Sequence, residues 1–234
     1  MMGHSHAVSG GLLFAAASGH LPVELVGPGF GPADLLMGTV LCAGAALLPD
    51  LDHHDSTLAH FLGPVSGVLC RVLGRVSGGH RHATHSLLFA ALAGAGTWAG
   101  IAHLGRGFVL GLTFCLLALA LRALHLHPPG NGPATWALPT GLAALGAAGL
   151  DSWLPNARYW LPCAVTLGVL AHLLGDFLTR RGIPLFWPYG RRYEIPLIKR
   201  TGNGVETKFL APLMTIATFV LLWCTVFPGT LPIS

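Results

Sequence analysis

Charged residues are scarce in this chain, and the scarcity argues against most soluble proteins. Only 9% of its 234 residues are charged, whereas 53% are hydrophobic. An average soluble domain carries about 25% charged residues, so this composition could hardly cover a water-facing surface. It disfavours a soluble protein with a large core and favours an integral membrane protein, in which 32 glycines and 17 prolines are tolerated.

Cysteine pairs and nucleophile motifs are also missing. The five cysteines stand singly in apolar segments and form no C-x-x-C pair, which argues against disulfides and cysteine-ligated zinc. Neither a G-x-S-x-G motif nor a P-loop occurs, so covalent acyl chemistry and nucleotide hydrolysis are disfavoured. The sequence shows no basic n-region before its first apolar run, and we expect no cleavable signal peptide.

Long apolar runs predict helices along most of the chain. They cover roughly 7–19, 33–48, 86–104, 107–124, 134–150, 160–178 and 209–227, and some are shorter than the ~20 residues of a straight span. Residues 57–76 are amphipathic and predict an interfacial helix. We expect a single all-α, polytopic membrane domain over 1–234, with about five to seven membrane-embedded helices around a metal site near one membrane face.

Basic residues indicate how these helices are oriented. Seven of the thirteen fall between 180 and 208, which points to a loop beside the membrane and not to a nucleic-acid surface. If that loop is cytoplasmic, counting back through the helices places 49–85 and the N-terminus on the same side. The candidate ligands described below then all fall on the cytoplasmic half.

Two aspartates follow an apolar run directly. Asp50 and Asp52 come after Leu48-Pro49, and in an extended segment residues two apart point the same way. Both carboxylates can then converge on one or two cations. The alternative is a helix C-cap that leads into a solvated loop.

A histidine and an aspartate share a face at the end of a later helix. His172 and Asp176 are four residues apart, which is how a helix offers two ligands to one metal. A buried hydrogen bond between them is the alternative. Thr179 follows three residues later, within reach of the same cavity.

Histidines also lead into the run that starts at residue 86. His80 and His85 are five residues apart, a spacing that one helix cannot easily present on one face. We expect His80 in the loop and His85 at the helix start. Arg81 is a fork-shaped donor suited to phosphate or carboxylate, and His82 is either a ligand or exposed.

The N-terminus offers two competing histidines. His6 stands at the mouth of the first helix, and His4 is its competitor. His125 and His127 lie apart from these clusters in the sequence, and we interpret them as polar or interfacial histidines, with adventitious metal binding as the alternative.

Seven metal ligands result from these clusters: His6, Asp50, Asp52, His80, His85, His172 and Asp176. One four-coordinate zinc needs fewer, so two neighbouring ions are expected. The histidines favour Zn²⁺, whereas the aspartates leave Mn²⁺ or Mg²⁺ open. A two-metal site activates a water and clamps the attacking and leaving oxygens of a phosphoester.

These residues resemble the YdjM-like family of bacterial inner-membrane metal-dependent hydrolases. The resemblance lies in L-L-P-D-L-D-H at 47–53 with Ser56, in G-H-R at 79–81 with T-H-S at 84–86, in 172–188, and in His6 with Gly10. It implies a helical, multi-pass protein of the bacterial inner membrane whose His and Asp residues bind divalent metal. The family is likened to zinc-dependent phospholipase C, which implies a phospholipid or another lipid-linked phosphate as substrate. His82 stands where the family often has glycine.

The sequence therefore predicts a membrane-embedded, metal-dependent hydrolase that cleaves a lipid or lipid-linked phosphoester with a metal-activated water. Arg81 is expected to neutralise the phosphate. The rival functions are a divalent-metal transporter and a metal-stabilised structural protein. Neither the general base nor the oligomeric state follows from the sequence. The expected catalytic residues are Asp50, Asp52, Arg81, Thr84, Ser86 and Thr179.

Overall fold

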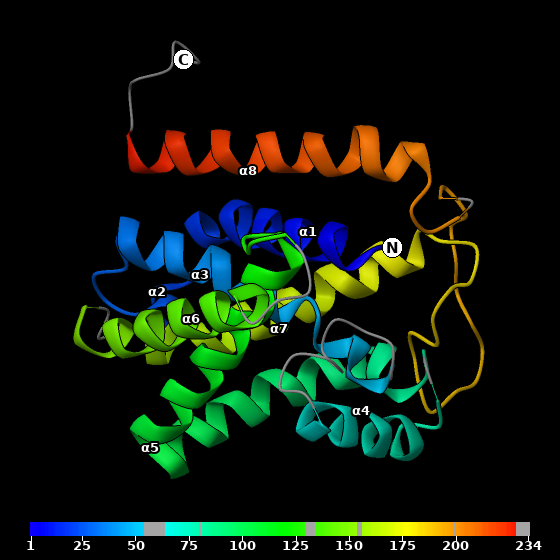
Figure 1. The fold of residues 1–234 in the computed structure, drawn as a ribbon, viewed down its shortest axis with the longest axis horizontal. Coiled ribbons are helices and arrows are strands. Elements are labelled where there is room, and N and C mark those ends of the chain that lie inside the picture. The colour runs from blue at the N-terminus through cyan, green and yellow to red at the C-terminus, as the bar shows by residue number, and fades with distance from the viewer. Residues whose placement is uncertain (54–63, 80, 130–133, 154–155, 199, 228–234) are drawn as a thin grey trace.

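Helices dominate the computed structural model, which describes residues 1–53, 64–79, 81–129, 134–153, 156–198 and 200–227 (Figure 1). The α-helices are α1 (Gly3–Ala17), α2 (Val23–Val26), α3 (Pro32–Ala45), α4 (Pro64–Val76), α5 (Leu87–Ala123), α6 (Ala134–Trp153), α7 (Ala157–Phe177) and α8 (Ala211–Val226). Within the described ranges, four segments are long and apolar enough to cross a membrane: Pro32–Asp52, Leu87–Ala123, Ala157–Phe177 and Glu206–Val226. The all-α, polytopic fold is confirmed. The expected count of five to seven membrane-embedded helices is only approximate beside these four segments.

Small residues let the three central helices α1, α3 and α7 approach one another closely. A Cβ atom added at Gly10 of α1 would lie 2.7 Å from the carbonyl oxygen of Cys42 in α3. One added at Gly168 of α7 would lie 2.6 Å from the same oxygen. Such contacts replace the hydrophobic driving force, which is absent between helices in lipid. The large buried side chains Phe14 and Trp160 fill the space between the helices.

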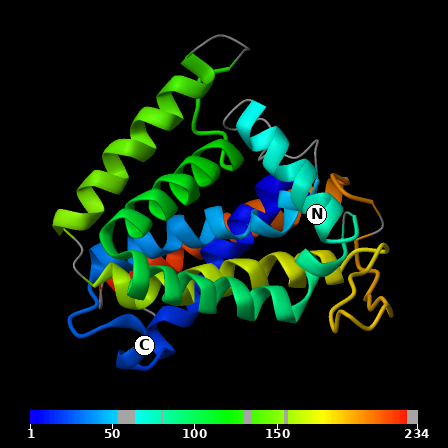
Figure 2. The ribbon, with the colours of Figure 1, turned by 90° about the horizontal axis from the view of Figure 1, so that it is seen from below.

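The long helix α5 reverses direction at a glycine. Its 37 residues would span about 55 Å if straight, far more than the ~30 Å apolar core of a bilayer. Gly105 has a non-helical backbone with φ of 61°, a conformation that glycine adopts readily. Gly100 packs directly on the ring of Phe108 across this break, and the two arms run in opposite directions (Figure 2). The sequence prediction of separate helices at 86–104 and 107–124 therefore describes the two arms.

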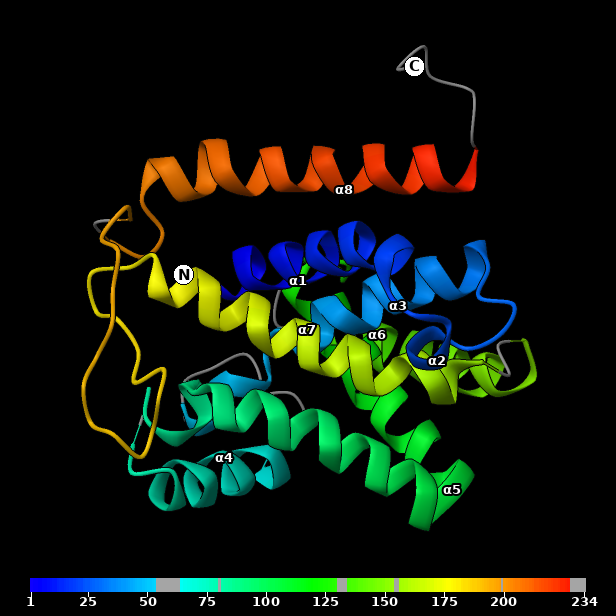
Figure 3. The same ribbon diagram turned by 180° about the vertical axis from the view of Figure 1, so that it is seen from behind.

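The remaining helices lie around this bundle. α6 packs on α5, and α8 packs mainly on α1 as an outer layer (Figures 1 and 3). A single π-helical turn, η4 (Glu206–Leu210), precedes α8. The amphipathic helix α4 contacts the short 3₁₀ turn η2 (Leu48–Asp52). Residues 57–63 of the predicted interfacial helix lie outside the described residues, whereas 64–76 are helical.

The segment after α7 folds back toward the start of α5. Ile183 pairs with Tyr193 in an antiparallel bridge, and Thr179 pairs with Ile198 in a parallel one. The carbonyl of Leu185 accepts a hydrogen bond from the backbone N–H of Leu87 at 3.0 Å. These contacts hold the residues that follow α7 against the N-terminal end of α5.

Candidate metal centre

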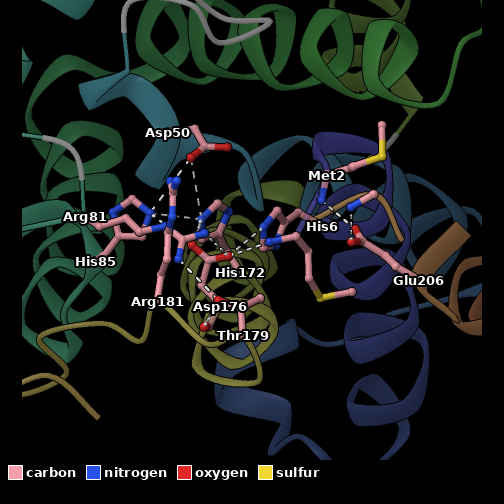
Figure 4. A network of polar contacts seen from close by, with 12 residues as sticks. Met2, His6, Asp50, Arg81, His85, His172, Asp176, Thr179, Arg181 and Glu206 are labelled. Carbon is pink, nitrogen blue, oxygen red and sulfur yellow. Dashed lines mark hydrogen bonds and ion pairs between the residues drawn. The ribbon is translucent and has the colours of Figure 1, made fainter. Parts of the chain in front are cut away.

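Polar side chains from four parts of the chain meet at one end of the bundle (Figure 4). α1 contributes His6, η2 contributes Asp50, the 3₁₀ turn η3 (Ala83–His85) contributes His85, and the last two turns of α7 contribute His172 and Asp176. The two histidines from η3 and α7 are fully buried. Because these groups stand near helix ends, the alternating helix directions gather them at one end, as the sequence predicts.

Two imidazole nitrogens lie close together at this end, and a carboxylate oxygen of Asp50 and one of Asp176 lie near both. Nε2 of His85 lies 3.2 Å from Nε2 of His172. Asp50 Oδ1 lies 3.9 Å from Nε2 of His85 and 3.8 Å from Nε2 of His172. Asp176 Oδ2 lies 3.6 and 3.7 Å from the same two nitrogens.

These separations suit an ion better than hydrogen bonds. The four nitrogen–oxygen distances exceed the usual N–H···O range of about 2.7–3.2 Å. In a tetrahedral zinc site with bonds of 2.0–2.1 Å, neighbouring ligand atoms are about 3.3 Å apart. The donor set of two imidazoles and two carboxylates is one that divalent metals take.

The other nitrogens of the two rings fix the orientation that a metal requires. Nδ1 of His172 donates to the carbonyl of Ala46 at 2.7 Å. Nδ1 of His85 lies 3.1 Å from the hydroxyl of Thr84, which itself donates to Asp52 Oδ2 at 2.5 Å. Metal-binding histidines commonly donate their second N–H to such acceptors. With each Nδ1 carrying the hydrogen of the neutral ring, the two Nε2 lone pairs face one another, and a cation between them removes their repulsion.

The protonation state of His85 agrees with this role. Burial lowers the pKa of His85, although its hydrogen bond to Asp52 acts in the opposite direction. A lowered pKa keeps the ring neutral near pH 7, which is the form that binds metal.

His6 joins the centre through the other oxygen of Asp176. Its Nε2 lies 3.4 Å from Asp176 Oδ1, and its ring stacks on His172 with centroids 3.7 Å apart and planes tilted by 13°. His6, His172 and Asp176 form a second group with ligand atoms within 4.8 Å of one another. Nδ1 of His6 is buried and finds no hydrogen-bond partner in the part of the chain that the structure describes.

Arg81 also binds this second oxygen. Its Nη2 donates to Asp176 Oδ1 at 2.8 Å, and its Nη1 donates to the hydroxyl of Thr179 at 3.2 Å. The amino group of Met1 is 2.6 Å from the same carboxylate oxygen. Asp176 therefore presents Oδ2 to His85 and His172, and Oδ1 to His6 and to cationic groups. Nε of Arg81 is buried and has no hydrogen-bond partner among the described residues.

The expectation that Asp50 and Asp52 lie on an extended segment is wrong. Residues 48–52 form a 3₁₀ turn, so the two carboxylates point to different neighbours. Asp52 accepts hydrogen bonds from the backbone N–H of Arg81 at 3.1 Å and from Thr84. It lies behind His85, on the Nδ1 side, whereas Asp50 faces Nε2. Asp52 thus orients a candidate ligand and takes no part in the two groups that the described residues form.

The other expected site residues have varied positions. Ser86 caps α5, because its hydroxyl accepts from the N–H of Phe89 and donates to the carbonyl of Ala83. His80 lies outside the described residues. His82 is exposed. His4 turns away from His6 and donates from Nδ1 to the carbonyl of Ala123 at 3.1 Å.

Two groups around the centre were not anticipated. The carbonyl of Ala46 orients His172, and no sequence pattern marks a backbone atom. Glu206 is fully buried and accepts from the backbone N–H groups of Met2 at 2.5 Å and Gly202 at 2.8 Å. It ties the start of α8 to the start of α1, near His6. The one available signal for Glu206 is a lone acid at the head of the last apolar run.

Comparison with known proteins identifies the family. The model of the family described as YdjM inner membrane protein matches residues 1–130 and 133–231. The chain belongs to the YdjM family. With its long apolar helices, it is a membrane protein with transmembrane helices, as expected.

Two curated relatives carry the YdjM name. The inner membrane proteins YdjM of Escherichia coli (strain K12) and Shigella flexneri are each 29% identical to this chain over 187 residues. Each alignment covers 80% of this chain and 64% of the relative, so the chain spans less than two thirds of their length. No solved structure matches the chain.

Proposed function

We propose that this member of the YdjM family is a metal-dependent hydrolase that cleaves the phosphoester of a lipid or lipid-linked substrate. The observation that carries the proposal is the convergence of Asp50, His85, His172 and Asp176 at separations that suit a divalent cation. Zn²⁺ is the favoured ion because two ligands are imidazoles, with Mn²⁺ and Mg²⁺ as the alternatives. Such an ion polarises a phosphoryl oxygen and makes a water nucleophilic at neutral pH.

The neighbouring residues support an anionic substrate. Arg81 places a guanidinium beside the centre, and its buried Nε is a free donor for a phosphate oxygen. Thr179 fixes this guanidinium by accepting from Nη1. In this proposal Arg81 orients and neutralises the phosphate, and Asp52 with Thr84 holds His85 in position.

A basic cavity adjoins the same turn. It has a volume of about 330 Å³, and its lining includes Asp52, His53, Arg71 and Arg75. The two arginines lie one helical turn apart on α4. Because Asp52 forms part of both the cavity wall and the support of His85, the cavity opens beside the centre. We propose that it receives the anionic headgroup of the substrate.

The number of ions and the side of the membrane are further parts of the proposal. A second ion would take His6 and Asp176 Oδ1 as ligands, at the position where Arg81 now binds. The basic residues that follow α7, including Arg180 and Arg181, lie at the same end of the bundle as the centre. By the positive-inside rule this end faces the cytoplasm.

The test is turnover by the protein purified in detergent without an affinity tag. Phospholipids and polyprenyl phosphates are offered as substrates, and release of phosphate or of the headgroup is measured. We expect activity that a chelator abolishes and that zinc or manganese restores. Asp50→Asn should be inactive yet folded, whereas His103→Ala, an exposed histidine on α5, should act like the wild type.

Two results would overturn the proposal. Normal turnover by the Asp50→Asn variant would remove the centre from the reaction. Zinc uptake into proteoliposomes, without hydrolysis of any substrate offered, would show a transporter instead.

A further inference from the structure

Three histidines outside the centre lie together on the surface. His4 from α1 faces His125, which directly follows the α5 C-cap, and the ring centroids are 5.4 Å apart. The ring of His127 is also near His125, with centroids 6.2 Å apart. The cluster joins segments about 120 residues apart in the chain. None of the three belongs to the ligand groups of the buried centre.

The outer two rings are oriented by backbone acceptors. Nδ1 of His4 donates to the carbonyl of Ala123 at 3.1 Å, and Nδ1 of His127 donates to the carbonyl of Pro128 at 3.0 Å. A carbonyl only accepts, so each ring in its neutral form carries its hydrogen on Nδ1 and its lone pair on Nε2. His172 of the buried centre follows the same pattern, which is typical of metal-binding histidines.

The central ring has a backbone conformation that a histidine rarely takes. The N–H of His125 donates to the carbonyl of Arg122, and the N–H of Leu126 donates to the carbonyl of Leu121. This pair of bonds is a Schellman motif, whose left-handed position is usually glycine. His125 occupies that position with φ of 58°. A strained side chain where glycine fits better points to a role for that side chain.

The spacing of the His4 and His125 rings is close to that of two imidazoles that share an ion. Two imidazoles on one tetrahedral zinc place their centroids roughly 5.2 Å apart, and His85 and His172 in the buried centre stand at 5.0 Å. The surface pairs at 5.4 and 6.2 Å are wider, so rotation of the rings is needed to bring their ligand atoms within reach of one ion.

We propose that His4, His125 and His127 form a second, surface metal site that takes an imidazole-binding cation such as Zn²⁺, Cu²⁺ or Ni²⁺. The class of ion follows from three nitrogen ligands and no carboxylate. An ion there would join the first turn of α1 to the end of α5. The site does not depend on the proposed hydrolase, because it shares no ligand with the buried centre.

The alternative is that these rings serve only the fold. In that case His4 only donates a hydrogen bond to the carbonyl of Ala123 at the end of α5, which is a known role for histidine at helix C-termini. Such a capping role explains neither why His125 stands at a glycine position nor why the rings of His4 and His127 lie near it.

The experiment counts zinc bound to tag-free protein in detergent at buffered micromolar free zinc. The key variant is His125→Gly, which removes the ring and relieves the backbone strain. We expect it to bind one equivalent fewer than the wild type while its melting temperature stays equal or rises. Asp50→Asn should keep the surface equivalent, and His103→Ala should lose neither.

A spectroscopic measurement tests the ligands directly. Cu²⁺ added to the Asp50→Asn variant should show splitting from imidazole nitrogens in its electron paramagnetic resonance spectrum. This splitting should disappear when His125→Gly or His127→Gln is combined with it. Equal zinc binding by the wild type and His125→Gly, or a copper spectrum that neither substitution changes, would overturn the proposal. Failure of the hydrolase assay would leave this result untouched.

Discussion

The two ends of α3 each hold an aspartate, and the surroundings of the two differ. Near the start of α3, Asp34 is buried and accepts from the indole N–H of Trp160 at 2.8 Å and from the N–H of Gly31 at 3.0 Å. After its end, Asp50 faces the imidazole nitrogens of His85 and His172 at 3.9 and 3.8 Å. Asp34 is within hydrogen-bond range of its donors, whereas Asp50 is beyond it.

This difference distinguishes Asp34, a carboxylate that serves the fold, from Asp50, a candidate metal ligand. Neutral N–H donors at hydrogen-bond distance satisfy Asp34, as buried polar groups require. Asp50 belongs to a set of lone pairs and negative charge with few hydrogens between them, which a cation would complete in the proposed site. Replacing the aspartate by asparagine should therefore lower metal affinity at Asp50 and the free energy of unfolding at Asp34.

The largest effect is expected for Asp50→Asn. Structural zinc sites gain about 10–16 kcal/mol from four ligands, so losing one charged ligand should weaken metal binding by roughly a hundredfold. The fold should persist, because this side chain is 23% exposed. Competition with a chromogenic chelator measures the affinity, and circular dichroism checks the fold. An unchanged affinity would contradict the assignment of Asp50 as a ligand.

A smaller loss of metal affinity is expected for Asp52→Asn, at the same end of α3. The carboxylate orients His85 from behind through Thr84, and loss of such an outer partner costs about 10–100-fold in metal affinity. We expect about tenfold, measured by the same competition. Thr84→Ser keeps the hydroxyl and is the matched control. A loss as large as that of Asp50→Asn would indicate direct ligation by Asp52.

The smallest effect is expected for Asp34→Asn. One hydrogen bond to a charged acceptor is weakened, so the free energy of unfolding should fall by about 1–2 kcal/mol. Metal content should stay at the wild-type value. Denaturant titration in detergent and elemental analysis provide the two readings. If this variant lost its metal, the distinction between the two ends would fail.

The sequence predicted the positions of the helices better than their connections. The two arms of α5 followed from two apolar runs, because apolar length alone decides where a membrane helix forms. The 3₁₀ turn at 48–52 was missed, because its conformation depends on packing with α4 and η3. A local pattern carries no information about those neighbours.

The grouping of candidate ligands near helix ends was predictable, and the groups that orient them were not. His85, His172 and Asp176 were found because ionisable groups beside apolar runs are rare. The sequence favoured His6 as the N-terminal ligand and left open whether His4 is one. Residues two apart on a helix point about 200° from each other, so both cannot face one site. The carbonyl of Ala46 belongs to the backbone, and its role is visible only once α3 and α7 are packed.

The spread of the ligands along the chain has a consequence for assembly. His85 and His172 are 87 residues apart, and α5 and α6 lie between them. During synthesis, the first ligands to emerge have no partners until α7 has been made and packed. Because metal binding is coupled to folding, capture of the proposed ion would be a late event that marks a completed bundle.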